Sequence, residues 1–137
     1  MLTARSTSTA VSTRPKYFPW TNPCAYDDGQ KAAFHREAAK RLRQLAKIMA
    51  LDKADYAIRS NKAGPAVSGE ITLHHERIYI QISQFGHADG ILYRSCRGRA
   101  DFAGGANNFA ALPLLDDLPS LARRIAPLLN TTIAESP

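Results

Sequence analysis

The stretch AVSGEITLHHERIYIQIS, residues 66–83, decides the fold class of this chain. Apolar residues alternate with polar ones in both halves of the stretch, at Val67, Ile71 and Leu73 and again at Ile78, Ile80 and Ile82. A period of two places such side chains on one face of an extended strand. Only His75 and Glu76 connect the two halves, so the sequence predicts a tight antiparallel hairpin with one apolar and one polar face.

Two further segments extend this hairpin to a four-stranded antiparallel meander. DYAIRS, residues 55–60, is a short strand followed by the turn residues NKAGP, and ILYRSCR, residues 91–97, follows the turn-forming QFGHADG. In the last strand we expect Ile91 and Tyr93 to face inward, with Arg94 and Cys96 facing outward.

Helical periods flank the strands on both sides. Residues 27–51 carry an apolar stripe at spacings of three and four, formed by Phe34, Ala38, Leu42, Leu45 and Met49. LPSLARRIAPLL, residues 118–129, repeats this period, and Pro127 is able to kink or end the helix. Because the isoleucine face is the only large apolar surface predicted, both helices are expected to pack on it. The predicted fold class is α+β.

The predicted organisation is an arm of residues 1–26, a single domain of residues 27–131 and a tail of residues 132–137. The arm has no Asp or Glu and is rich in Ser and Thr, which is typical of an extended or disordered basic segment. Its aromatic YFPW stretch, residues 17–20, is expected to dock on its own domain or on a partner. After the fourth strand, Phe102 and Phe109 are expected to pin a Gly- and Asn-rich loop onto the core.

Basic residues form the first candidate binding surface. On the predicted helix 27–51, one cation per turn falls opposite the apolar stripe, giving a ridge of Arg36, Lys40, Arg43 and Lys47. A solvated helix face is one interpretation, and a surface for phosphates or for an acidic protein is the other. The net charge of +6 favours anionic partners without deciding between them.

The polar face of the sheet is the second candidate surface. It and the strand end that follows carry the candidate binding residues Arg59, Arg77, Tyr79, Arg94, Arg97 and Arg99. Arginine and tyrosine supply stacking planes and phosphate partners for single-stranded nucleic acid, whereas a plain solvent-exposed face has the same composition. A metal-independent ribonuclease is a minor alternative, but Glu70 and His74 lie about 13 Å apart along one strand, too far to act on one phosphate.

Other classes of site find no support in the sequence. Because His74 and His75 are adjacent in a strand, they point to opposite faces and cannot share a metal ion. The sequence has no phosphate-binding loop, dinucleotide fingerprint or nucleophile elbow, so we expect no cofactor. Cys24 and Cys96 are expected to be free thiols of a cytoplasmic chain without a membrane span.

The sequence therefore leads to an expectation of a small non-enzymatic binding module with a basic surface. Nucleic acid is the first expected partner, and an acidic protein surface is the second. The alternative class is an inhibitor, adaptor or assembly component that binds a larger protein through residues 1–26 and the arginine-rich segment formed by Arg94, Arg97 and Arg99. The oligomeric state stays open.

Overall fold

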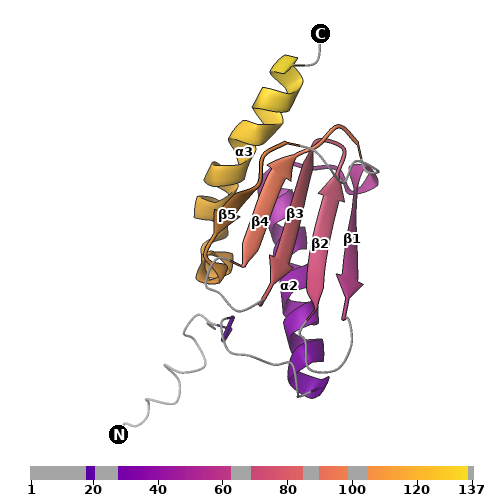
Figure 1. Ribbon diagram of the computed structural model, residues 1–137, viewed down its shortest axis with the longest axis vertical. Coiled ribbons are helices and arrows are strands. Elements are labelled where there is room, and N and C mark those ends of the chain that lie inside the picture. The colour runs from indigo at the N-terminus through magenta and orange to yellow at the C-terminus, as the bar shows by residue number, and fades with distance from the viewer. Residues whose placement is uncertain (1–17, 21–27, 63–68, 85–89, 99–104, 136–137) are drawn as a thin grey trace, which may run out of the picture.

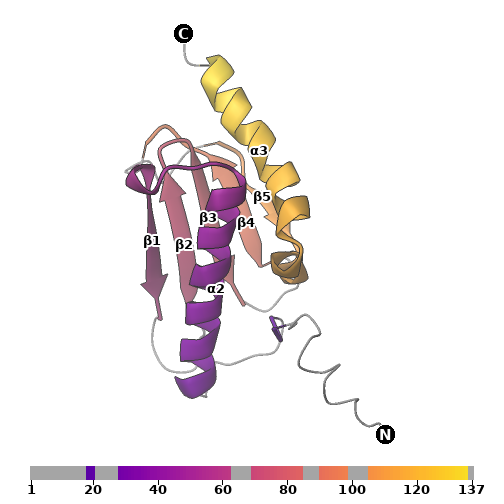
Figure 2. The same cartoon turned by 180° about the vertical axis from the view of Figure 1, so that it is seen from behind.

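The structure, a computed structural model, describes residues 18–20, 28–62, 69–84, 90–98 and 105–135, with side chains described up to residue 129. Within these residues an antiparallel sheet carries both α-helices on one face (Figures 1 and 2). The predicted α+β class is confirmed, with five strands in place of the four expected.

The long helix α2 spans Asp28–Ile48 and has the predicted apolar stripe. Phe34, Ala38, Leu42 and Leu45 are fully buried, and Met49, just beyond the helix, packs against the same core. The helix stops because Ala50 takes a left-handed φ of 58° and Leu51 donates its N–H back to the Ala46 carbonyl over 2.8 Å. The short 3₁₀ helix η1, Lys53–Asp55, then leads into the sheet.

The strands run in the order in which they occur in the chain, each antiparallel to the next. They are β1 Tyr56–Asn61, β2 Glu70–His75, β3 Ile78–Ser83, β4 Ile91–Ser95 and β5 Asn108–Ala110. Leu73 pairs with Ile80, and Ile80 pairs with Tyr93, so apolar side chains line up across the sheet on the side of the helices. This inner face forms one side of the hydrophobic core, as the alternation of apolar and polar residues predicted.

The fifth strand lies in the segment that the sequence assigned to a loop. β5 pairs with β4 through Leu92 and Phe109, and the inward Ala110 lies opposite Ile91. Phe109 was expected to pin the loop onto the core, and this is wrong: the register turns it to the outer face, where it is 54% exposed. Phe102 lies outside the described residues.

The second helix, α3, spans Leu118–Glu135 and follows the 3₁₀ helix η2, Leu112–Asp116. Asp117 caps it, because its carboxylate accepts from both the N–H and the hydroxyl of Ser120. Leu121 and Ile125 are fully buried, and the helix contacts both α2 and β4. Of the two effects that Pro127 could have, it does not end this helix, since α3 continues for two further turns.

Phe18 and Trp20, from the predicted arm, dock on their own domain. Trp20 is 1% exposed and belongs to the core, where its ring meets Phe34 edge-on at 6.2 Å between centroids. Phe18 lies against Trp20 at 4.6 Å. Phe18 and Trp20 are therefore part of the packed domain.

Candidate functional site

The predicted ridge is present on α2. Arg36, Lys40, Arg43 and Lys47 are all exposed, whereas the opposite side of the helix is buried. At 1.5 Å rise per residue the four cations extend over about 16 Å. Among the described residues, none of the four takes part in an ion pair. Within the described residues, the ridge is therefore a row of positive charges without ion-pair partners.

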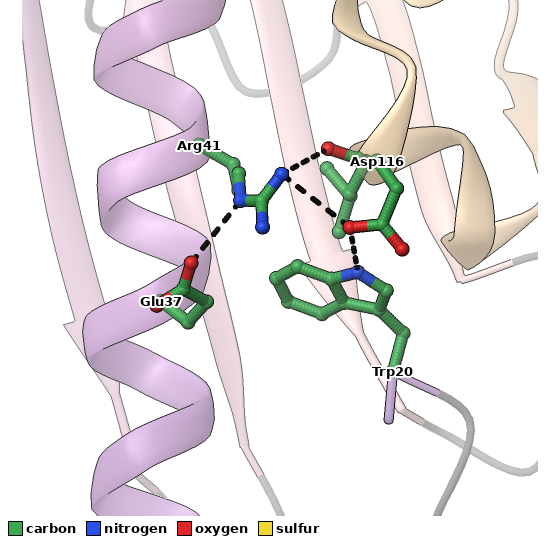
Figure 3. Close-up of polar contacts among 5 residues, drawn as sticks. Trp20, Glu37, Arg41 and Asp116 are labelled. Atoms are coloured by element: carbon green, nitrogen blue, oxygen red, sulfur yellow. Dashed lines mark hydrogen bonds and ion pairs between the residues drawn. The ribbon is translucent and has the colours of Figure 1, made fainter. Parts of the chain in front are cut away.

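A fifth cation of the same helix, Arg41, has a structural role that the sequence did not reveal (Figure 3). Its Nε donates to Oε2 of Glu37 at 3.2 Å, and its Nη1 donates to the Leu115 carbonyl at 3.0 Å. Nη1 also lies 3.4 Å from Oδ1 of Asp116, which accepts from the indole N–H of Trp20. Arg41 thus joins α2, η2 and the segment at Trp20 in one network.

On the outer face of the sheet, a row of side chains crosses the strands from β1 to β4. The register aligns Ala57, His74, Tyr79 and Arg94. The guanidinium of Arg94 lies over the Tyr79 ring, with Cζ 4.2 Å from the centroid, and His74 meets that ring edge-on at 5.1 Å. Tyr79 was expected to offer a stacking plane, yet the residue is only 9% exposed and its ring is already in contact with Arg94 and His74.

Two further groups act on the Tyr79 hydroxyl. It donates a hydrogen bond to Oε1 of Gln81 at 3.0 Å. Burial raises the pKa of this phenol, the negative charge of Glu70 raises it further, and the positive charge of Arg94 lowers it in part. The neutral phenol is therefore the favoured form in the folded protein.

Arg94 itself is buried, with 8% of its surface exposed. Its Nε has no hydrogen-bond partner among the residues that the structure describes, so contact with the Tyr79 ring is the main described support for its charge. The sequence placed Arg94 correctly on the polar face but gave no sign of this burial. A stacked neighbour on the adjacent strand becomes visible only once the register is known.

A hollow of about 300 Å³ opens on the same face, toward the edge formed by β1. Its lining comes from outward residues of three strands: Ala57, Arg59, Asn61, Glu70, Thr72, His74 and Tyr79. Arg59 is exposed at the rim, and Glu70 is half-buried. Although their charges are opposite, these two side chains form no ion pair with each other in the described structure.

The remaining predicted arginines do not join this hollow. Arg77 is half-buried before β3, and its backbone N–H donates to Nδ1 of His75 at 3.0 Å. Arg97 is exposed beyond the end of β4, and Arg99 lies outside the described residues. The expected group at positions 94, 97 and 99 is therefore seen only as one buried and one exposed arginine.

The histidines and the described cysteine also have definite surroundings. His74 shares the outer face with Tyr79, and His75 pairs with Tyr56 on the inner side. Cys96 was expected to face outward; it is buried, it is not part of a disulfide in the described structure, and its thiol donates to the His75 carbonyl. Among the described residues, no group of three potential metal ligands occurs, and neither helix has the length and apolarity needed to cross a bilayer.

The structure separates the predicted binding residues into two surfaces. The ridge belongs to α2, behind the sheet in Figure 1, whereas Arg59, Tyr79 and Arg94 lie on the outer face of the sheet. No family model, curated protein or solved structure matches this chain. The ridge of α2 and the outer face of the sheet are therefore the two candidate binding surfaces.

Proposed function

We propose that this protein is a non-enzymatic nucleic-acid-binding module that holds the phosphate backbone along the ridge of α2. The observation that carries the proposal is the row formed by Arg36, Lys40, Arg43 and Lys47, exposed and without carboxylate partners in the described chain. A cation that is already paired with a carboxylate adds little to the affinity for a phosphate. An unpaired, exposed cation adds more, because it displaces counterions that are condensed on the nucleic acid and releases them into solution.

The contrast within α2 supports the proposal. Arg41, on the side of the helix that meets η2, is engaged by Glu37 and Asp116. In the part of the chain that the structure describes, the four cations of the ridge form no ion pair. Because a helix presents these side chains about one turn apart, the ridge can follow a phosphate backbone over about 16 Å.

The ridge suits this role better than the outer sheet face. Tyr79 and Arg94, the stacking candidates there, are buried against each other. Base stacking needs an open ring face, so binding through the sheet would first have to separate this pair. Phosphate contacts along the ridge need no such rearrangement, and such contacts give affinity without sequence specificity.

The salt dependence of binding tests the proposal. Fluorescence anisotropy with a labelled 20-base-pair duplex should give a plot of log K against log[salt] with a slope near −3.6, if four phosphates are neutralised at about −0.9 each. For a single strand the slope should be near −2.8. Failure of the wild-type chain to bind either oligonucleotide at about 50 mM salt would overturn the proposal.

A matched pair of variants distinguishes the effect of the ridge on affinity from the effect of net charge. The first carries Arg36→Gln, Lys40→Gln, Arg43→Gln and Lys47→Gln, and the second changes the exposed Lys53, Lys62, Arg123 and Arg124 to Gln. Both lose four positive charges. We expect the ridge variant to lose at least about 100-fold in affinity near 0.1 M salt, since each lost contact is worth close to tenfold. Equal losses in both variants would mean that charge alone, and not the ridge, drives binding.

An acidic protein surface is the second candidate partner, because the same row of cations would attract it. Binding of a larger protein through the N-terminal aromatic residues has less support, since Trp20 is buried in the core of its own domain. A pull-down with and without nuclease separates the two partners. A co-purifying protein that is unaffected by nuclease and lost in the ridge variant would favour the acidic protein.

A further inference from the structure

The outer face of the sheet carries a second feature that nucleic-acid binding does not use. No described element covers this face, which Figure 1 shows directly. The register aligns one outward residue from each strand in a row across the whole sheet: Arg59, Thr72, Gln81, Leu92 and Phe109. The two ends of this row have complementary shapes.

At one end, Phe109 protrudes from β5. It is 54% exposed beside the half-buried Leu92, although it sits in a paired strand. Among the described residues, the only other large apolar side chain exposed to a similar degree is Ile48, at 49%, on the helix side of the molecule. Phe109 is thus a single aromatic protrusion on an otherwise mainly polar sheet face.

At the other end lies the hollow of about 300 Å³ next to β1. Ala57 has the smallest side chain of its lining. Cavities of about 150 Å³ accept a benzene ring, so this hollow has room for the side chain of a phenylalanine. Arg59 at its rim provides a cation for the face of an entering ring.

We propose that a second copy of this chain docks on the outer sheet face, with Phe109 of each copy in the hollow of the other. Phe109 and the centre of the hollow lie at opposite edges of the same row. A two-fold axis that runs parallel to the strands above Gln81 therefore superposes β5 of one copy on β1 of the other. Each contact then occurs twice, as an isologous dimer requires.

The sheet geometry accommodates this arrangement. Stacked sheets pack about 10 Å apart and are rotated by about 30°, which shifts the rows of the two copies against each other at the edges. The hollow tolerates such a shift because its lining extends over three successive outward residues of β1, from Ala57 to Asn61. The neighbouring row that contains His74, Tyr79 and Arg94 does not have to rearrange when the two sheets dock.

Charge also favours this face for self-association. Each copy carries a net charge of +6, and association through the helices would bring the two basic ridges together. With the sheets in contact, the ridges lie on opposite outer sides of a four-layer assembly, about 30 Å apart at layer spacings near 10 Å. This separation exceeds the Debye length of about 8 Å at physiological salt, so mutual repulsion is small.

The area of the outer sheet face limits how tightly the two copies are expected to bind. Five strands at about 4.8 Å spacing and roughly 17 Å length give about 400 Å² of flat area per copy. Standard stable interfaces bury about 800 Å² per partner. The dimer should therefore be weak and reversible, with a dissociation constant in the micromolar range or above.

Analytical ultracentrifugation of the full chain from about 1 to 500 µM tests the proposal. We expect a concentration-dependent monomer–dimer equilibrium for the wild type. Phe109→Ala removes the protrusion and Ala57→Leu fills the hollow, and each should raise the dissociation constant at least tenfold. Ile48→Ala is the matched control and should leave the dissociation constant unchanged. Near-UV circular dichroism of each variant verifies that it is folded.

Mixing the two variants tests the symmetry itself. In a heterodimer, Phe109 of the A57L chain enters the intact hollow of the F109A chain, and no ring meets the filled hollow. An equimolar mixture should therefore dimerise more tightly than either variant alone. A monomeric wild type at 500 µM, an effect of I48A equal to that of F109A, or no gain on mixing would each overturn the proposal, as would a small molecule that co-purifies in the hollow of a monomeric chain.

Discussion

At the scale of single residues, Tyr79 shows how the register assigns chemistry. Its place in the alternation puts it on the outer face, where side chains are usually solvated. Its neighbours in the row, Arg94 and His74, nonetheless cover its ring. The contact with Arg94 contributes on the order of 0.5–2 kcal/mol. Both the burial and the nearby carboxylate of Glu70 then keep the phenol protonated.

The raised pKa of Tyr79 predicts a loss of stability at high pH. A group whose pKa is higher in the folded than in the unfolded state contributes its full stability below the unfolded value, near 10, and loses that contribution as pH rises through the folded value. Urea denaturation between pH 8 and 11.5 should show a smaller decline for Tyr79→Phe than for the wild type. The substitution also removes the bond to Gln81, a cost that appears equally at every pH below 10. Parallel declines in the two proteins would contradict the assignment.

At the scale of elements, the ends of helices and the shortest strand depend on their surroundings. β5 has three residues, too few for a periodic signal, and exists because β4 offers it an open edge. Just before β5, Gly105 donates its backbone N–H to the Ser95 carbonyl at 2.8 Å, which holds the chain next to the end of β4. α3 passes through Pro127 because Leu121 and Ile125 anchor it in the core.

Pro127 therefore weakens a helix that packing maintains. It lacks the N–H that would bond to the carbonyl of residue 123, and its ring strains the preceding turn. We expect Pro127→Ala to raise the free energy of unfolding by about 1–3 kcal/mol in urea titrations. Pro119→Ala is the control, because Pro119 sits in the first turn of α3, where the missing N–H costs nothing, and its effect should stay within about 0.5 kcal/mol. Equal effects of the two substitutions would argue against an unbroken helix.

At the scale of the whole molecule, the segment at Trp20 closes the core between α2 and η2. The indole packs on Phe34, donates to Asp116 and lies under the guanidinium of Arg41. Gln84, after β3, donates in turn to the Trp20 carbonyl at 2.6 Å. Contacts between such distant parts of the chain make the segment a structural component of the domain.

Trp20→Ala should consequently destabilise the fold. Removing a fully buried tryptophan leaves a cavity and removes the hydrogen bond that the indole donates to Asp116, for which we expect a loss of about 3–5 kcal/mol in denaturant unfolding. Phe109→Ala, the exposed aromatic control, should change stability by less than about 0.5 kcal/mol in dilute solution. Unfolding of the Trp20 variant at the wild-type denaturant concentration would show that the segment is dispensable.

The sequence by itself determined the local geometry of this protein. The period of two in residues 70–83 and the period of 3.6 in α2 specify which side chains share a face, and the apolar faces then require both helices on one side of the sheet. The ridge of α2 followed from the same arithmetic. These features are predictable because they depend only on residues a few positions apart.

Only the tertiary structure decided the rest. The pairing of β5, the outward turn of Phe109, the burial of Arg94 and the docking of Trp20 all join residues far apart in the chain. Their physical basis is the register between strands and the space left between packed elements, and neither leaves a periodic trace in the sequence.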